Sequence, residues 1–200
     1  AVDLRCLRLC AAHARRLGPR PDYHVNIMPA TLLQTPSPEL VRALTDGRDD
    51  VTCCLEISEQ QLLGDPSVLV PHVRELQQAG VRIAIDDVGF GNSCLEGLIM
   101  LHPQVIKVDK RLVRGLAVDP EMRRALSRLL RVADVLEAEV VAEGIETTDD
   151  FQVLVDMGVR FGQGFLFGRP VPCKEAASGV PDAAAADELL DMFSSVDPAL

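Results

Sequence analysis

The sequence predicts an α/β fold in which parallel strands alternate with helices, and two observations support it. Six short runs rich in Val, Ile or Phe are apolar almost throughout, which is typical of parallel strands covered on both faces. Helical patterns separate these runs, and such alternation indicates βα units arranged as an open sheet or a closed barrel. The predicted strands are 23–27, 51–57, 81–86, 104–109, 139–142 and 159–165.

The first three predicted helices follow from periodicity and proline positions. Residues 2–16 read as a helix, and a second runs from Pro29 to residue 44, because proline suits a first helical turn. A third begins near residue 65 and closes at a glycine at position 80, a favoured residue just after a helix. Pro71 lies inside this third segment, so we expect regular helix only from there.

The last two predicted helices have clearer signals. Residues 121–137 carry the most distinct apolar stripe of the chain. Thr148 is predicted to cap a helix over 149–157, which Gly158 ends. From residue 174 to 200 the chain becomes an Ala-rich acidic tail, with one short amphipathic helix predicted at 187–193. We interpret it as a loosely attached terminus, and the alternative is a helix that docks on or links to another domain.

The length and the net charge of the chain restrict the functions it can have. Two hundred residues suit one domain, and no apolar run approaches the roughly 18 residues that span a membrane. The net charge of -10 argues against a DNA- or RNA-binding surface. An anionic substrate would therefore have to be met locally by a metal or a lysine. The chain starts at Ala1 without a signal-like segment, which suggests a fragment.

The six cysteines do not form a recognisable disulfide or zinc pattern. Cys53 and Cys54 are neighbours on one predicted strand and point to opposite faces. Cys6 and Cys10 share a helix face, and we expect them to be small buried residues rather than ligands. Reduced thiols and a cytoplasmic location follow as expectations.

Two adjacent carboxylates, Asp86 and Asp87, end a short apolar strand and enter a glycine loop. Neighbouring carboxylates repel each other, and burying either one alone costs free energy. A cation normally shares such a place, and a divalent metal is the commonest one.

Other predicted strands also end in polar groups, and in parallel α/β folds these ends meet at one rim. Oxygen ligands suit Mg²⁺, Mn²⁺ or Ca²⁺ better than zinc. The four histidines do not join this pattern, and we expect each at the surface or at a helix end. The rim residues are Asn26, Glu56, Asp86, Asp87, Lys107, Asp109, Glu143, Glu146 and Gln163.

Each of these residues also has an ordinary explanation. Asn26 could cap the next helix, Lys107 could keep its ammonium in water, and Gln163 could bond only to backbone. Glu143 and Glu146 could belong to a turn. Six successive strand ends with metal-binding or charge-balancing groups nevertheless favour a common site.

The same residues lie in motifs that occur in a characteristic order. The motifs are Val25-Asn26-Ile27, Leu55-Glu56-Ile57-Ser58-Glu59, Ala84-Ile85-Asp86-Asp87-Val88-Gly89-Phe90-Gly91, Ile106-Lys107-Val108-Asp109, Val141-Ala142-Glu143-Gly144-Ile145-Glu146 and Gln163-Gly164-Phe165-Leu166-Phe167-Gly168-Arg169-Pro170. This set, from about residue 3 to about 172, resembles the EAL family of bacterial phosphodiesterases, which hydrolyse cyclic di-GMP.

The resemblance implies a TIM-like (β/α) barrel and a two-metal hydrolysis that gives linear pGpG, with Mg²⁺ or Mn²⁺. It implies that Asn26, Glu56 and Asp86 are metal ligands and that Asp87 serves the second ion. Lys107 matches the lysine that contacts the attacking water and phosphate. The further matches are Glu143 as general base or metal ligand, Glu59 as support for the loop after the aspartate pair, and Asp109, Glu146 and Gln163 as further site residues.

The chain also departs from the family. No Glu-Ala-Leu motif precedes Asn26, and only about six of eight strands are predicted, with the opening hairpin absent. The glycine loop and a nearby position differ from the family at Val88, Phe90, Asn92, Cys94 and Met28. We therefore expect 1–173 to be an EAL-type domain without its first two strands, and the 200 residues alone to hydrolyse little cyclic di-GMP.

Two other functions are kept as alternatives. A non-catalytic EAL-like module could bind cyclic di-GMP or a protein partner, and an unrelated metal enzyme could act on a small phosphate ester. A homodimer and additional sensory or signalling domains are further implied partners of the family resemblance.

Overall fold

The computed structural model describes residues 2–17, 22–45, 52–62, 65–89 and 94–171. Within this part, six strands form one parallel sheet in chain order, which confirms the predicted fold class. The strands are β1 Asp22–Asn26, β2 Thr52–Ser58, β3 Arg82–Val88, β4 Val105–Val108, β5 Glu139–Ala142 and β6 Phe161–Gly162. The predicted tail at 174–200 lies outside the described residues.

Helix α1 precedes β1, and the other helices lie between successive strands along the chain. The α-helices are α1 Val2–Leu17, α2 Pro29–Gln34, α3 Ser37–Thr45, α4 Val70–Gln78, α5 Cys94–Leu101, α6 Lys110–Val113, α7 Pro120–Val135 and α8 Thr148–Asp156. Two short 3₁₀ turns, η1 Glu59–Gln61 and η2 Pro66–Leu69, lie between β2 and α4. None of the helices that the structure describes is long and apolar enough to cross a membrane.

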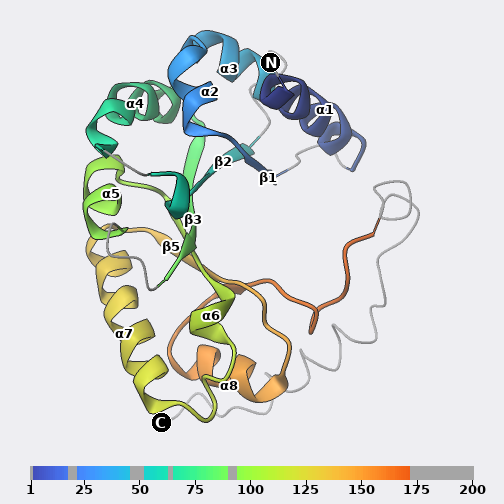
Figure 1. Cartoon of the computed structure of the whole chain (residues 1–200). Helices are drawn as coiled ribbons and strands as arrows, with labels where there is room; N and C mark the ends of the chain where they lie inside the picture. Colours follow the sequence, from blue (N-terminus) through green and yellow to red (C-terminus); the bar gives the residue numbers. More distant parts are fainter. Residues whose placement is uncertain (1, 18–21, 46–51, 63–64, 90–93, 172–200) are drawn as a thin grey trace.

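The sheet curves into a partial barrel with helices on its outer side (Figure 1). Among the described strands, β1 and β6 each pair with one neighbour, so the six strands do not close. This agrees with the prediction of an incomplete TIM-like barrel.

The two faces of the sheet are packed differently because side chains alternate along each strand. Leu55, Ile57, Ile83, Ile85 and Ile106 face outward into the large core beneath the helices. On the inner face, a small buried layer lies below the carboxyl ends of the strands; it consists of Cys54, Ala84, Val105 and the partly buried Val141. The next inward-facing position on these strands carries the polar residues of the candidate site.

The structure corrects several predicted elements. The second helix is broken into α2 and α3 at Thr35, which is extended (φ -110°, ψ 125°) because a residue before proline avoids the helical region. Strand β6 is only two residues long, and the helices α5 and α6 were not predicted. The cap of α8 is Thr147, whose hydroxyl accepts from the Asp150 N–H, not Thr148.

Two other expectations are tested. Cys6 and Cys10 are exposed, so the prediction that they are buried was wrong. Gly80 and Gly158 have φ values of +84° and +82°, which confirms them as left-handed residues that end α4 and α8.

Candidate functional site

A buried lysine lies at the centre of the strand ends. Lys107, on β4, is 5% exposed, and its Nζ lies 2.9 Å from Glu56 Oε1, 3.0 Å from Asp86 Oδ1 and 2.8 Å from Glu143 Oε1. The three carboxylates come from β2, from β3 and from the residue that follows β5. The ordinary explanation, in which the ammonium of Lys107 reaches into water, is therefore wrong.

The charges of this cluster shift one another's pKa. Burial alone would lower the pKa of Lys107, but hydrogen bonds from its ammonium to Glu143 and Glu56 outweigh burial and raise it. Burial would raise the pKa of Glu56, but the hydrogen bonds that its carboxylate receives from His24 and Lys107 lower it. Burial dominates at Glu143 and raises its pKa despite Lys107. Lys107 is thus held as an ammonium among carboxylates of unequal basicity.

A second group of carboxylates adjoins Lys107. One ligand oxygen from each of Asp86, Asp87 and Glu143 lies within 4.8 Å of the other two, a spacing that one cation can bridge. Asp87 has a φ of +60°, which aspartate tolerates better than most residues and which turns its side chain away from the strand alternation. Burial, followed by the charges of Asp86 and Asp109, raises the pKa of Asp87. This all-oxygen set fits a hard divalent ion such as Mg²⁺, Mn²⁺ or Ca²⁺.

The loop after β3 is supported from two sides. The buried carboxylate of Glu59 accepts a hydrogen bond from the Gly89 N–H at 3.2 Å. Asp109, also buried, caps α6 by accepting from the Arg111 N–H at 2.7 Å, and the Asp109 N–H donates to Val88 O at 2.9 Å. These contacts place Glu59 and Asp109 beside the carboxylate pair rather than among the candidate ligand atoms.

The remaining predicted residues lie at different distances from the centre. Asn26 ends β1 and pairs in register with Glu56, so it stands at the edge of the cluster. Gln163 follows β6, and its amide donates a hydrogen bond to Glu143. Glu146 forms an exposed ion pair with Arg114, the residue after α6, and lies outside the cluster around Lys107.

Sequence reasoning missed His24. Its Nδ1 lies 2.8 Å from Glu56 Oε1, the oxygen that also contacts Lys107. The signal was its position on β1, two residues before Asn26 and therefore on the same face of the strand. The expectation that no histidine joins the site was wrong for this residue.

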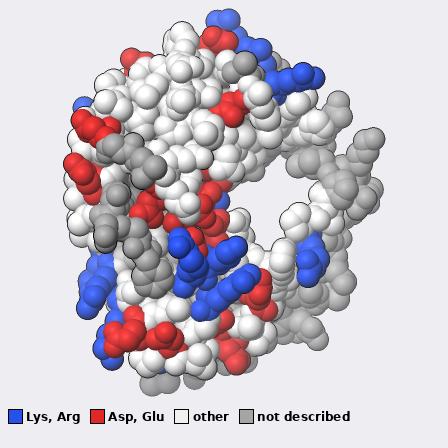
Figure 2. Space-filling view, viewed as in Figure 1, with Lys and Arg blue, Asp and Glu red and all other residues white. Residues whose placement is uncertain are grey.

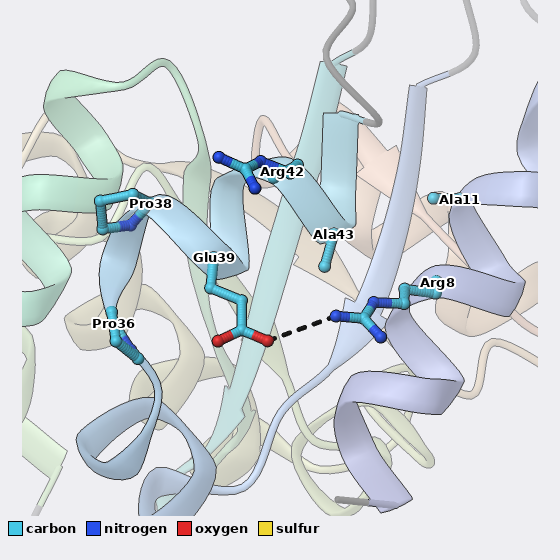
Figure 3. Close-up of a pocket in the computed structure, with 7 residues that line it drawn as sticks. All are labelled: Arg8, Ala11, Pro36, Pro38, Glu39, Arg42 and Ala43. Carbon is cyan, nitrogen blue, oxygen red and sulfur yellow. Dashed lines mark hydrogen bonds and ion pairs between the residues drawn. The ribbon is translucent and has the colours of Figure 1, made fainter.

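A separate pocket of about 540 Å³ lies between α1 and the start of α3 (Figure 3). Arg8 and Glu39 form an ion pair across it at 3.3 Å, and both side chains are well exposed. Its lining comes from α1 and from residues 36–43, so none of the carboxylates at the strand ends reaches it. We assign it no part in the site.

A family model described as "EAL domain" matches residues 2–170 of the chain. Among curated relatives, the Escherichia coli protein named "Probable cyclic di-GMP phosphodiesterase PdeA" is 32% identical over 169 residues, which are 83% of this chain and 23% of that protein. A Mycobacterium tuberculosis protein named "Uncharacterized protein Rv1354c" is 36% identical over 126 residues, 63% of this chain and 20% of its own length. The chain thus spans about a fifth of these relatives.

Solved structures give the same result. A manganese and cyclic di-GMP complex of Klebsiella pneumoniae BlrP1 has a TM-score of 0.76 and 32% identity, covering 84% of this chain and 44% of that one. The EAL domain of Mycobacterium smegmatis DcpA has a TM-score of 0.78 and 27% identity, covering 86% and 80% of the two chains. A BlrP1 complex with calcium and cyclic di-GMP is also similar, with a TM-score of 0.76.

Proposed function

Because the chain belongs to the EAL domain family, we propose that it is the larger part of a domain that hydrolyses cyclic di-GMP to linear pGpG. One observation carries this proposal: the oxygen cluster of Asp86, Asp87 and Glu143 lies directly beside the buried ammonium of Lys107. Relatives whose structures contain cyclic di-GMP with manganese or calcium support the same substrate and a divalent metal requirement.

The residues divide into metal holders and charge carriers. Asp86 and Asp87, with Glu56 and Asn26 at the neighbouring strand ends, would hold two Mg²⁺ or Mn²⁺ ions. Such ions, when bound, lower the pKa of water and stabilise the attacking and leaving oxygens of an in-line displacement.

Lys107 and Glu143 act next to these ligands. The Lys107 ammonium offsets the negative charge that grows on the phosphate oxygens. Glu143, whose raised pKa makes it a better proton acceptor, would take a proton from the attacking water or complete the second ion's ligands. Gln163 orients Glu143 through its amide. The cations together explain how a chain with a net charge of -10 can accept an anionic dinucleotide.

The domain proposal keeps the predicted boundaries, with the EAL-type unit at 1–173 and the acidic tail at 174–200. Residues 1–200 contain no Glu-Ala-Leu motif, whose glutamate serves as a metal ligand in the family. We therefore predict weak hydrolysis by these 200 residues alone, because the loss of one ligand weakens metal binding and disturbs two-metal geometry.

The test measures pGpG formation from cyclic di-GMP with Mn²⁺ and with EDTA. It compares two proteins: residues 1–200, and an extended chain that also includes the residues encoded upstream of Ala1. We expect turnover from the extended chain and its loss with EDTA or in Glu143→Gln. The matched variant Glu137→Gln, in the turn after α7, should show no change. Binding without any product would favour a non-catalytic module. Hydrolysis of generic phosphoesters without cyclic di-GMP turnover would favour an unrelated phosphoesterase.

Homodimer formation and attachment to sensory or signalling domains are also part of the proposal. Attachment to other signalling domains is supported by a relative from Pseudomonas aeruginosa, named "Bifunctional diguanylate cyclase/cyclic di-GMP phosphodiesterase MucR". Light scattering coupled to gel filtration tests homodimer formation, and a mass of about 22 kDa for residues 1–200 would contradict a dimer.

A further inference from the structure

A basic patch borders the acidic site. It consists of Lys110 and Arg111 on α6 and of Arg114 directly after it, all exposed. Figure 2 shows blue side chains gathered over α6, next to the red carboxylates of the strand ends. The chain has ten more acidic than basic residues, and the position of this patch beside the carboxylates suggests a role in the same site.

The basic patch adjoins two segments that carry residues of the candidate site, the one with Lys107 and the one with Glu143. Helix α6 begins directly after Asp109, two residues beyond Lys107. Lys110 packs against Gly144, the neighbour of Glu143: a Cβ added to this glycine would lie 2.5 Å from the Lys110 Cβ. The start of α6 is therefore held against the segment that carries Glu143.

Arg111 has the geometry of a prepared anion contact. Its guanidinium is held on Asp109, with Nε 3.1 Å from both carboxylate oxygens and Nη2 2.9 Å from Oδ2, yet 57% of the side chain is exposed. The Asp109 N–H donates to Val88 O at 2.9 Å, directly after Asp87, and this places the ion pair near the carboxylate pair. Arg114 is also paired, but with Glu146, which lies outside the cluster around Lys107.

We propose that Lys110 and Arg111 form a subsite for the second phosphodiester of the cyclic dinucleotide, an inference that rests on the proposed function. The substrate carries two phosphodiesters, and only one can lie at the metal ligands beside Lys107. The other must lie farther out, where the carboxylates of the strand ends repel it. Lys110 and Arg111 supply exposed positive charge there, and guanidinium groups suit phosphate oxygens.

The test compares two probes on the extended chain of the functional test, in the presence of Ca²⁺. Cyclic di-GMP has two phosphodiesters, and the linear dinucleoside monophosphate GpG has one. By calorimetry, we expect Lys110→Gln/Arg111→Gln to bind cyclic di-GMP about tenfold more weakly, because two charge-assisted contacts are lost. Binding of GpG should change less than about twofold. Arg124→Gln on α7, another exposed arginine paired with a carboxylate, should bind both probes as the unaltered chain does.

Equal weakening for both probes, or none for cyclic di-GMP, would overturn the subsite. If the unaltered chain does not bind cyclic di-GMP, whether or not it binds GpG, the proposed function itself fails. This outcome is distinguishable from failure of the subsite because it is measured on the protein without any substitution. Thermal unfolding checks that the double variant is folded. If it is not, Lys110→Gln alone should weaken only cyclic di-GMP binding, by about threefold, and Arg111→Lys should retain most of it.

Discussion

The ammonium of Lys107 lies 2.8 Å from Oε1 of Glu143, although 35 residues separate the two in sequence. Parallel pairing brings them together: the Glu143 N–H donates to Val108 O at 3.0 Å and so extends the β4–β5 ladder by one residue. This backbone bond fixes Glu143 at the carboxyl end of β5, from which its side chain reaches Lys107. The ion pair is therefore a consequence of the register of the sheet.

Lys107→Met should destabilise the metal-free protein by about 3 kcal/mol at pH 7, because it leaves Glu56, Asp86 and Glu143 without their shared cation. Methionine has nearly the same length, so the loss reports charge rather than a cavity. Mn²⁺ should restore more stability to this variant than it adds to the unaltered chain. Urea unfolding with and without Mn²⁺ measures both effects.

The control for this prediction is Lys110→Met, which removes an exposed lysine and should change the free energy of unfolding by less than about 0.5 kcal/mol. If Lys107→Met is as stable as the control, the buried ion cluster does not exist in the metal-free protein.

Asp150→Asn should destabilise the protein by about 2 kcal/mol at pH 7. The Asp150 carboxylate accepts hydrogen bonds from the N–H groups of Gly115 and Ala117 and from the Thr147 hydroxyl, at 2.9–3.1 Å. Burial would raise the pKa of Asp150, but these hydrogen bonds outweigh it and lower the pKa. Asparagine lacks the second acceptor oxygen, so one donor loses its partner.

The pH dependence of this variant has a definite sign. A carboxyl with a lowered pKa in the folded state stabilises the protein above its unfolded-state value of about 3.8, and this contribution is lost as the pH falls below it. The difference between the two proteins should therefore stay constant from pH 7 to about 5 and shrink below about 4. Urea unfolding across this range measures it, and a difference that grows on acidification would refute the assignment.

Gly164→Ala should destabilise the protein by about 3 kcal/mol, since a Cβ there would lie 2.1 Å from the Ile145 carbonyl oxygen. The backbone of Ile145 bonds to both sides of this glycine, through Gln163 O and the Leu166 N–H, and cannot move away freely. Gly158→Ala is the matched control. Its added Cβ meets nothing within 4 Å, so only its φ of +82° costs stability, about 1 kcal/mol. Equal losses for both variants would show that the close approach at Gly164 is not tight.

The sequence predicted the elements whose signals are local and repeated. Five of the six strands lie within a few residues of their predicted bounds, because buried parallel strands are continuous apolar runs. Helix α6 was missed since its four residues are too few to show a period, and it depends on the Asp109 cap. The break between α2 and α3 depends on Pro36 and Pro38, whose signal was outweighed by the helical pattern around them.

Most residues of the candidate site could be predicted from the sequence, but their contacts with one another could not. The expectation that strand ends share one rim selected Lys107 together with Glu56, Asp86 and Glu143. In the structure, an oxygen of each of these three carboxylates lies within 3.0 Å of the Lys107 ammonium. The same logic grouped Glu146 with them, and the structure pairs it with Arg114 instead. Position along a loop, unlike position on a strand, does not fix where a side chain points.

Asp87→Asn should remove most of the stabilisation that Mn²⁺ gives the protein. A ligand that binds only the folded state raises stability according to its concentration relative to its dissociation constant. Loss of one of the three carboxylates of the Asp86, Asp87 and Glu143 cluster should weaken binding by at least about tenfold and reduce the melting-temperature shift accordingly. Asparagine also accepts the left-handed backbone of residue 87, where φ is +60°, so the substitution changes charge without adding strain.

Asp134→Asn, an exposed carboxylate near the end of α7, is the matched control and should leave the Mn²⁺ shift intact. The measurement is the melting temperature as a function of Mn²⁺ concentration for the three proteins. An undiminished shift in Asp87→Asn would place the bound ion elsewhere. A shift lost in Asp87→Asn but not in Asp134→Asn ties it to the carboxylate cluster, since the two variants lose the same charge and differ only in where that charge lies.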